Sequence, residues 1–244
     1  TSQPVGRFPW RFGYRGEDHD GGEKTLLGHT GNFDGEDIID IIVKEPATAR
    51  FICRHLYNFF VADEVQVPAW TIEDARDEDA LEVMINAFEE SGYEIKAVLR
   101  TMFNSDFFKN ARYSKIKSPA EVVASTLKMV GTYQTPEPTI PDIGPESTYM
   151  GQSLLDPPSV EGWYTGQEWI NSGSLLARIN FVADRVANTS LPGIQTIIDR
   201  IKDDGVNTPE ELVGASLEYM GFLEVGDGTM SQLLDRARKP NRRR

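Results

Sequence analysis

The chain has 244 residues, with 38 acidic against 25 basic side chains and a formal net charge of −13. So acidic a chain repels nucleic acid and anionic membrane surfaces, because phosphate binding depends on clustered Lys and Arg. No apolar run approaches the roughly 20 residues that a transmembrane helix needs. The single cysteine, Cys53, excludes an intramolecular disulfide and a cysteine-based zinc cluster. We therefore expect a globular protein with no nucleic-acid partner and no transmembrane segment.

Residues 1–33 are rich in Gly, aromatic and charged residues and show no sustained period, which predicts an irregular segment. Four of its side chains, Glu17, His19, Asp20 and His29, have the carboxylate and imidazole groups that bind divalent cations. A cation held there would polarise a substrate oxygen or activate a water, as in a metal-assisted hydrolase. The alternative is a solvated, acidic turn.

Residues 34–235 read as one helical domain. Asp34 is a good N-cap, Pro46 suits a first helical turn, and Ser118 and Thr208 each open a capping box that continues with Pro and a later Glu. Later helices are expected at about 73–91, 93–104, 119–130, 172–186, 192–202 and 209–221. No stretch alternates with period two between turn signals. The sequence therefore predicts an all-α fold of eight to ten helices with long Gly/Pro/Trp-containing loops.

Two further segments stand out by composition. Four prolines fall within 132–147, which predicts an extended, helix-poor connection inside the folded unit. Six basic residues and no acid follow Asp235, so we expect 236–244 to be a basic, solvated tail.

The loop at 151–173 contains Trp163 and Trp169 among Gly, Gln, Glu and Asn residues. Such aromatic and amide side chains could line a surface that stacks a sugar or another flat ligand. The alternative is that both indole rings fill the helical core. A complete nucleophile elbow, a phosphate-binding loop and a dinucleotide fingerprint are all missing from the sequence.

Several short blocks together resemble the bacterial domain-of-unknown-function family 1800, over about residues 8–185. These blocks are His19-Asp20 with Lys24-Thr25-Leu26-Leu27-Gly28, Glu45 to Phe51, Leu56 to Val61, Lys117-Ser118-Pro119 with Glu121, Gly151-Gln152, Pro157 to Val160 with Gly162-Trp163, and Trp169-Ile170 with Leu176, Arg178, Asn180 and Phe181. Because Arg178 stands in one of these blocks, it joins Trp163 and Trp169 as a candidate ligand-binding residue.

The resemblance implies a context rather than an activity. Members of the family are usually longer, with a helical N-terminal region, and many look exported. Their genes often lie beside a second family that resembles alkaline-phosphatase-type or sulfatase-type hydrolases. The chain then corresponds to the C-terminal half of such a protein, and its start at Thr1 is expected to be processed or truncated.

The leading hypothesis is a non-catalytic structural or binding module that acts with a protein partner, including the missing N-terminal half, in the cell envelope. The metal-assisted hydrolase at 17–29, with a divalent metal as its cofactor, and the carbohydrate-binding surface at Trp163 and Trp169 remain the alternatives.

Overall fold

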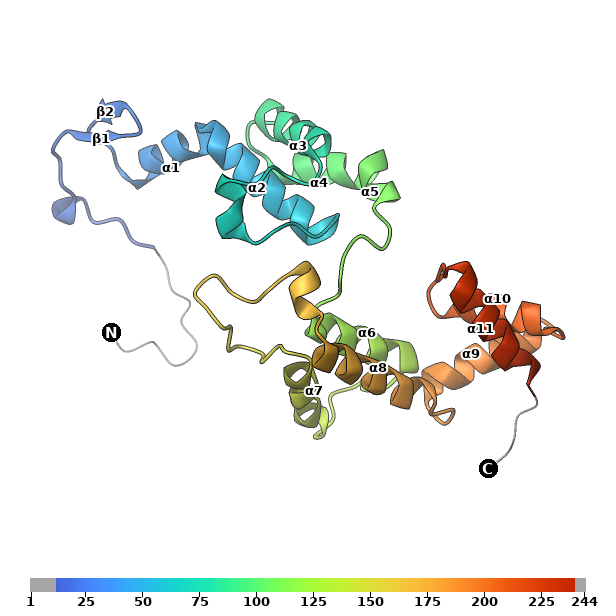
Figure 1. Cartoon of the computed structure of the whole chain (residues 1–244). Coiled ribbons are helices and arrows are strands. Elements are labelled where there is room, and N and C mark those ends of the chain that lie inside the picture. Colours follow the sequence, from blue (N-terminus) through green and yellow to red (C-terminus); the bar gives the residue numbers. More distant parts are fainter. Residues whose placement is uncertain (1–11, 240–244) are drawn as a thin grey trace. The chain divides into compact units, whose positions relative to one another are not determined.

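The structure is a computed structural model that describes residues 12–239 (Figure 1). Within that range it contains eleven α-helices and one sheet of two short strands. The expectation of an all-α fold is confirmed, with one helix more than the upper number expected. Residues 1–11 and 240–244, which belong to the predicted N-terminal segment and basic tail, lie outside the described residues.

Contacts along the chain divide the structure into two compact units. The first unit comprises residues 12–62 together with 74–112, and the second comprises 63–73 together with 113–239. A division by contacts does not show whether the two units fold independently or together. The single helical domain at 34–235 therefore stays a prediction.

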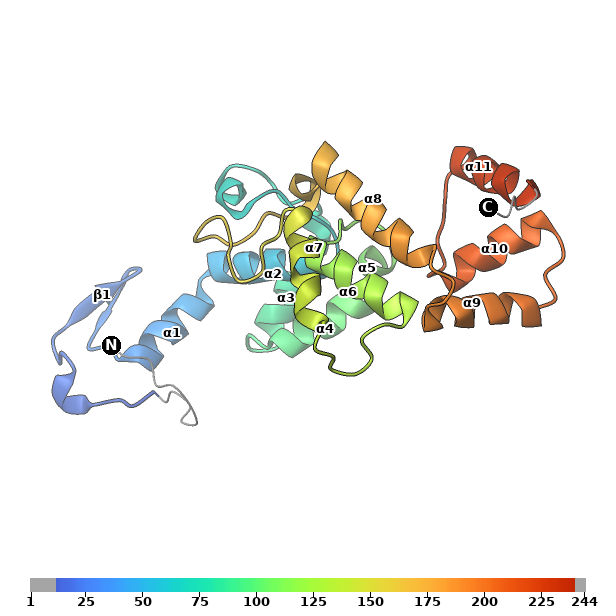
Figure 2. The same cartoon turned by 90° about the horizontal axis from the view of Figure 1, so that it is seen from below.

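The first unit is built on three helices that pack together (Figures 1 and 2). Its elements are a 3₁₀ turn Gly16–Asp18, strands β1 (Lys24–Leu26) and β2 (His29–Gly31), and helices α1 (Gly35–Lys44), α2 (Pro46–Phe60), α3 (Glu78–Glu90), α4 (Ile95–Asn104) and α5 (Asp106–Asn110). The core lies between α2, α3 and α4, where the apolar residues recur at helical spacing. Its buried side chains are Ala49, Cys53, Tyr57, Val61, Ala62, Ala80, Leu81, Met84, Phe88, Val98 and Met102.

The N-terminal segment is more regular than its sequence indicated. Strands β1 and β2 pair antiparallel, with Leu26 opposite His29. The two residues between the strands, Leu27 and Gly28, both have positive φ, at 47° and 84°. This is the backbone that a two-residue hairpin of the primed type requires.

The second unit contains the remaining six helices of the described range. Its elements are the 3₁₀ turns Val67–Thr71, Ile140–Ile143 and Gly166–Trp169, and helices α6 (Pro119–Val130), α7 (Gly144–Tyr149), α8 (Ser172–Val186), α9 (Pro192–Asp203), α10 (Pro209–Tyr219) and α11 (Asp227–Arg238). Helix α6 packs against α7, α8 and α9, and α10 packs against α9 and α11 (Figures 1 and 2). Its main core cluster is smaller, with Val123, Met150 and Phe181 as the buried members.

The predicted capping boxes are confirmed: the side chain of Ser118 accepts from Glu121 N, and that of Thr208 from Glu211 N. A close backbone approach joins α6 to α9. Gly131 ends α6 in the left-handed region, and a Cβ added at Gly193 would collide with the Met129 carbonyl oxygen. Glycine at 193 is therefore what lets the start of α9 meet the end of α6.

Two segments differ from the sequence expectation. Residues 132–147 are not extended throughout, because Pro141 and Pro145 occupy first-turn positions of the 3₁₀ turn Ile140–Ile143 and of α7. The basic tail begins inside a helix, since Arg236 and Arg238 lie in the last turn of α11 and Arg238 pairs with Glu210.

A search of the described residues for a helix long and apolar enough to span a bilayer finds none.

Candidate functional site

The four predicted metal ligands are spread over the N-terminal hairpin and the turn before it. Glu17 lies exposed in the 3₁₀ turn Gly16–Asp18, and His29 lies exposed in β2. His19 is half-buried, and its Nε2 is 3.2 Å from the Phe33 carbonyl oxygen. Asp20 Oδ1 accepts a hydrogen bond of 2.8 Å from Gly22 N, which closes a local turn.

Across residues 12–239 no three His, Cys, Asp or Glu side chains form a group that could hold a metal ion. His29 lies on a strand opposite Leu26, whereas the ring of His19 lies against the Phe33 carbonyl. The metal site at 17–29 stays a prediction that metal analysis of the protein would test.

The two tryptophans of the 151–173 loop lie in different environments. Trp169 ends the 3₁₀ turn Gly166–Trp169 and is 5% exposed. Its carbonyl oxygen accepts a hydrogen bond of 2.8 Å from the Ser174 hydroxyl. Trp163 is half-buried, and its indole Nε1 is a buried donor without a hydrogen-bond partner among the described residues. A sugar platform needs an exposed ring face, which Trp169 does not offer, so that interpretation now depends on Trp163.

Arg178 is positioned by α8, whose inward face also carries the buried residues Ser174 and Phe181. These three residues follow one another at spacings of four and three, so they share one side of the helix. The Arg178 side chain is 8% exposed. Its Nη1 donates a hydrogen bond of 2.7 Å to the Lys117 carbonyl oxygen, whereas its Nε and Nη2 are buried and have no partner within 12–239.

Burial lowers the pKa of Arg178, and no neighbouring carboxylate raises it again. A guanidinium remains charged at neutral pH even when its pKa falls, because its ordinary value is so high. The site therefore contains a desolvated positive charge with two unsatisfied donor nitrogens.

The start of α6, which Arg178 reaches, has its own donors satisfied. Ser118 and Glu121 cap each other's backbone N–H groups, and the Ala120 N–H donates 2.8 Å to Gln152 Oε1. Gln152 is itself buried and directly follows Gly151. Sequence reasoning noticed Gly151-Gln152 only as part of a family block and did not find this capping role.

Arg185, two turns after Arg178 on α8, is an arginine whose charge has partners within the same unit. Its Nη2 lies 3.3 Å from Glu146 Oε1, and its guanidinium carbon lies 3.6 Å from the centroid of the Phe181 ring. The same helix thus presents one arginine with a carboxylate partner and one without.

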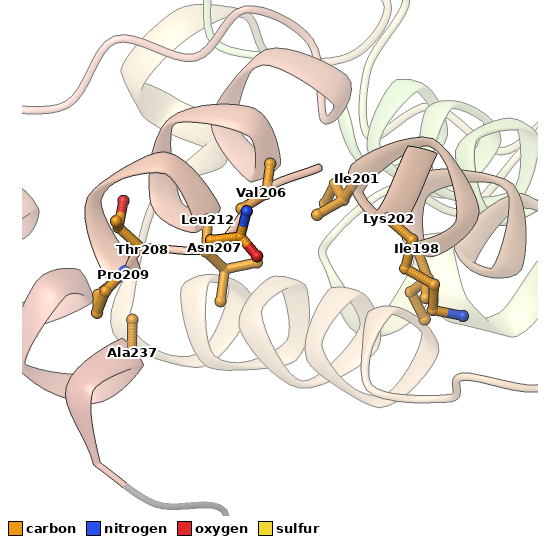
Figure 3. A pocket seen from close by; sticks show the side chains of 9 residues that line it. All are labelled: Ile198, Ile201, Lys202, Val206, Asn207, Thr208, Pro209, Leu212 and Ala237. Atoms are coloured by element: carbon orange, nitrogen blue, oxygen red, sulfur yellow. The ribbon is translucent and has the colours of Figure 1, made fainter. Parts of the chain in front are cut away.

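Two apolar cavities in the second unit contain none of the predicted site residues. One, of about 460 Å³, lies among α9, α10, α11 and the turn before α10 (Figure 3). It is lined by Ile198, Ile201, Lys202, Val206, Asn207, Thr208, Pro209, Leu212 and Ala237. The other, of about 390 Å³, lies between α6, α7 and the turn at Ile140–Ile143. Both have mainly apolar walls and no carboxylate or histidine.

Cys53 is buried in the core of the first unit. Burial, with a contribution from the charge of Glu89, raises the pKa of its thiol to about 11. Since the thiolate is the reactive form of cysteine, Cys53 is suited to packing rather than to nucleophilic chemistry.

The fold and site define an all-α protein in which a tryptophan-containing loop leads into a helix with a buried, incompletely satisfied arginine. The chain belongs to the family described as "Protein of unknown function (DUF1800)", whose sequence model matches residues 6–244. The family match therefore extends well past the 8–185 stretch over which the short blocks resemble it. No curated protein and no solved structure matches the chain.

Proposed function

We propose that this protein is a non-catalytic binding module that acts with a partner protein in the cell envelope. The observation that carries the proposal is an exposed apolar face on α8. Leu176 and Ile179 are 58% and 55% exposed, and Leu175 and Ala183 are exposed beside them. Contiguous exposed apolar side chains mark interaction surfaces more often than isolated ones do.

The positions of these residues on α8 place them on the side of the helix that faces away from the core of its unit. Residues 175, 176, 179 and 183 follow the helical repeat on one side, while Ser174, Arg178 and Phe181 are buried on another. Helix α8 is therefore apolar on a side that its own unit does not bury. A partner that covers this side would bury apolar area, which favours association by about 25 cal/mol for each Å².

Helix α1 carries a second surface of this kind. Its sequence is strongly amphipathic, yet none of its residues is fully buried, and Ile39 is exposed. An amphipathic helix usually buries its apolar stripe. The first unit therefore adds a second apolar face on which a partner can dock.

The envelope location depends on the family resemblance, which implies that many members are exported. Cell fractionation of the native host, with antibodies against the full-length protein, tests it. Recovery only in the cytoplasmic fraction would contradict the proposed envelope location. It would leave the proposed binding surface on α8 unaffected.

Site-specific photo-crosslinking in the native host tests the binding surface. A photoreactive residue at Leu176 is expected to give one adduct of defined mass, and the additional change Ile179→Asp should abolish it. The matched control is the same probe at Asp184, which is exposed on α8, lies around the helix from Leu175 and Ile179, and should give no adduct. Equal labelling from both positions, or no adduct from Leu176, would contradict the proposal.

A further inference from the structure

The unsatisfied donors of Arg178 lie on a single edge of its guanidinium group. Nε–H and Nη2–H point in parallel from that edge, and this pair makes the bidentate contact with a planar oxyanion. Nη1, the third nitrogen, already donates to the Lys117 carbonyl oxygen. The two-pronged side of the group is therefore buried without a hydrogen-bond partner among the described residues, while its other side is anchored.

The charge around this edge has the wrong sign for an isolated arginine. Lys117 and Ser118 directly precede α6, so the guanidinium lies at the N-terminus of a helix of twelve residues. That end of a helix has a partial positive charge and favours anions. The carboxylate at this end, Glu121, is engaged by the Ser118 N–H, so burial and the helix dipole both act against the charge of Arg178.

Arg185 shows that this unit supplies a counter-charge to another arginine of α8, from α7. Glu146 pairs with it across the same unit. For Arg178, by contrast, no described carboxylate takes that role. A missing anion accounts at once for the unpaired edge and the desolvated charge.

We propose that the Nε/Nη2 edge of Arg178 is a binding site for an oxyanion, a carboxylate or a phosphate, which accepts both hydrogen bonds. The anion completes the charge pair that the unit itself lacks, and α8 and the N-terminus of α6 hold the guanidinium in place for it. This inference does not depend on the partner protein proposed above.

The test is an NMR titration of the full chain labelled with ¹⁵N-arginine. Acetate, inorganic phosphate and chloride are added separately at matched ionic strength while the Nε–H resonances of Arg178 and Arg185 are followed. We expect a saturable shift of the Arg178 resonance with at least one oxyanion, and none with chloride. Acetate and phosphate distinguish a carboxylate site from a phosphate site. The Arg185 resonance serves as the internal control and should stay in place.

Two variants test whether the Nε/Nη2 edge of Arg178, rather than positive charge alone, binds the anion. R178K keeps the charge and loses the bidentate edge, so the affinity measured by thermal shift should fall about tenfold or more. R185K should bind as the unaltered protein does.

The proposal would be overturned if the Arg178 Nε–H resonance did not shift with either oxyanion, or shifted equally with chloride. That result would indicate that water fills the site. An R178K variant of unchanged affinity would also overturn the proposal. The titration of the unaltered chain decides the matter even if R178K fails to fold. Because it uses small anions and no partner, it can fail while the crosslinking experiment succeeds, or succeed while that one fails.

Discussion

Arg54 in α2 and Arg178 in α8 are the two arginines whose side chains are buried in the described part of the molecule, one in each unit. Arg54 is 2% exposed, and its Nη2 donates a hydrogen bond of 2.8 Å to the Asp74 carbonyl oxygen. Its charge also acts on Glu78, which makes a two-pronged ion pair with Arg50 at 2.6 and 2.8 Å. None of the nitrogens of Arg54 is left buried without a partner.

Arg178 is buried to a similar degree but has one hydrogen bond and two orphan donors. Burial of a guanidinium is tolerable when acceptors from the same chain replace its water, as they do for Arg54. The second unit retains an equally costly group without that replacement. The difference teaches that Arg54 belongs to the architecture of its unit, whereas Arg178 is positioned for an acceptor from outside it.

The largest effect is expected from Arg54→Met, which removes a satisfied buried charge. The Asp74 carbonyl oxygen loses its donor and Glu78 loses a favourable neighbour, so the free energy of unfolding should fall by about 3 kcal/mol. Urea denaturation followed by circular dichroism measures the change. The matched control is Arg50→Met on the same helix, whose ion pair is more than a third exposed and should cost at most about 1 kcal/mol. Equal losses from the two variants would mean that the burial of Arg54 adds nothing.

The next effect is a dependence on pH that Glu78 imposes on the first unit. The hydrogen bond from Arg50 is the main reason that the pKa of Glu78 falls from 4.5 to about 2. A carboxyl whose pKa is lowered in the folded state adds stability above its unfolded pKa and loses it as the pH falls through the folded value. Because the pair is partly exposed, we expect about 1 kcal/mol.

Comparison with Glu78→Gln isolates this effect. The unaltered protein should be the more stable of the two above pH 4.5, and its advantage should disappear as the pH falls toward 2. Urea midpoints at a series of pH values give the difference. An advantage that does not change with pH would contradict the role of the ion pair.

The helices that could be predicted from sequence are those with strong end signals. Helix α8 runs over the expected Ser172–Val186, and the boxes at Ser118 and Thr208 cap α6 and α10. Helix α11 was missed because its N-cap residue is Gly226, which offers no side-chain cap, and because it has few apolar residues. The hairpin was missed because each strand has three residues and its turn is Leu27-Gly28 rather than Asn-Gly.

For the candidate site, the sequence indicated which residue types could take part but not which residues contact one another. Arg178 donates to a carbonyl 61 positions earlier, and Arg185 pairs with a carboxylate 39 positions earlier. No local period or cap encodes such contacts, because they arise when distant helices pack. Proximity in sequence was equally uninformative for Glu17, His19, Asp20 and His29, which form no group of three or more potential metal ligands in the described part of the chain.

A smaller effect is expected from Arg178→Met, although this arginine is buried like Arg54. The variant gives up one hydrogen bond but also removes a desolvated charge and two orphan donors. Replacement of a buried charge by an apolar side chain of similar size is often neutral, so the free energy of unfolding in chloride buffer should change by less than about 1 kcal/mol. Urea denaturation alongside Arg54→Met makes the comparison direct. A loss as large as that of Arg54→Met would show that the guanidinium is satisfied within the chain.

The smallest effect is expected from Trp163→Phe, which removes the other buried donor that has no partner. The phenyl ring keeps most of the apolar surface, and deletion of an unsatisfied N–H relieves its desolvation cost, so the change should stay within about 0.5 kcal/mol. Trp70→Phe in the same unit is the matched control, because Trp70 Nε1 donates a hydrogen bond of 2.8 Å to the Val65 carbonyl oxygen. Loss of that bond should cost about 1 kcal/mol. Urea denaturation followed by circular dichroism compares them without relying on indole fluorescence. If Trp163→Phe proves the more costly variant, the indole N–H of Trp163 has an acceptor in solution, and the unsatisfied donors of the second unit would be reduced to those of Arg178.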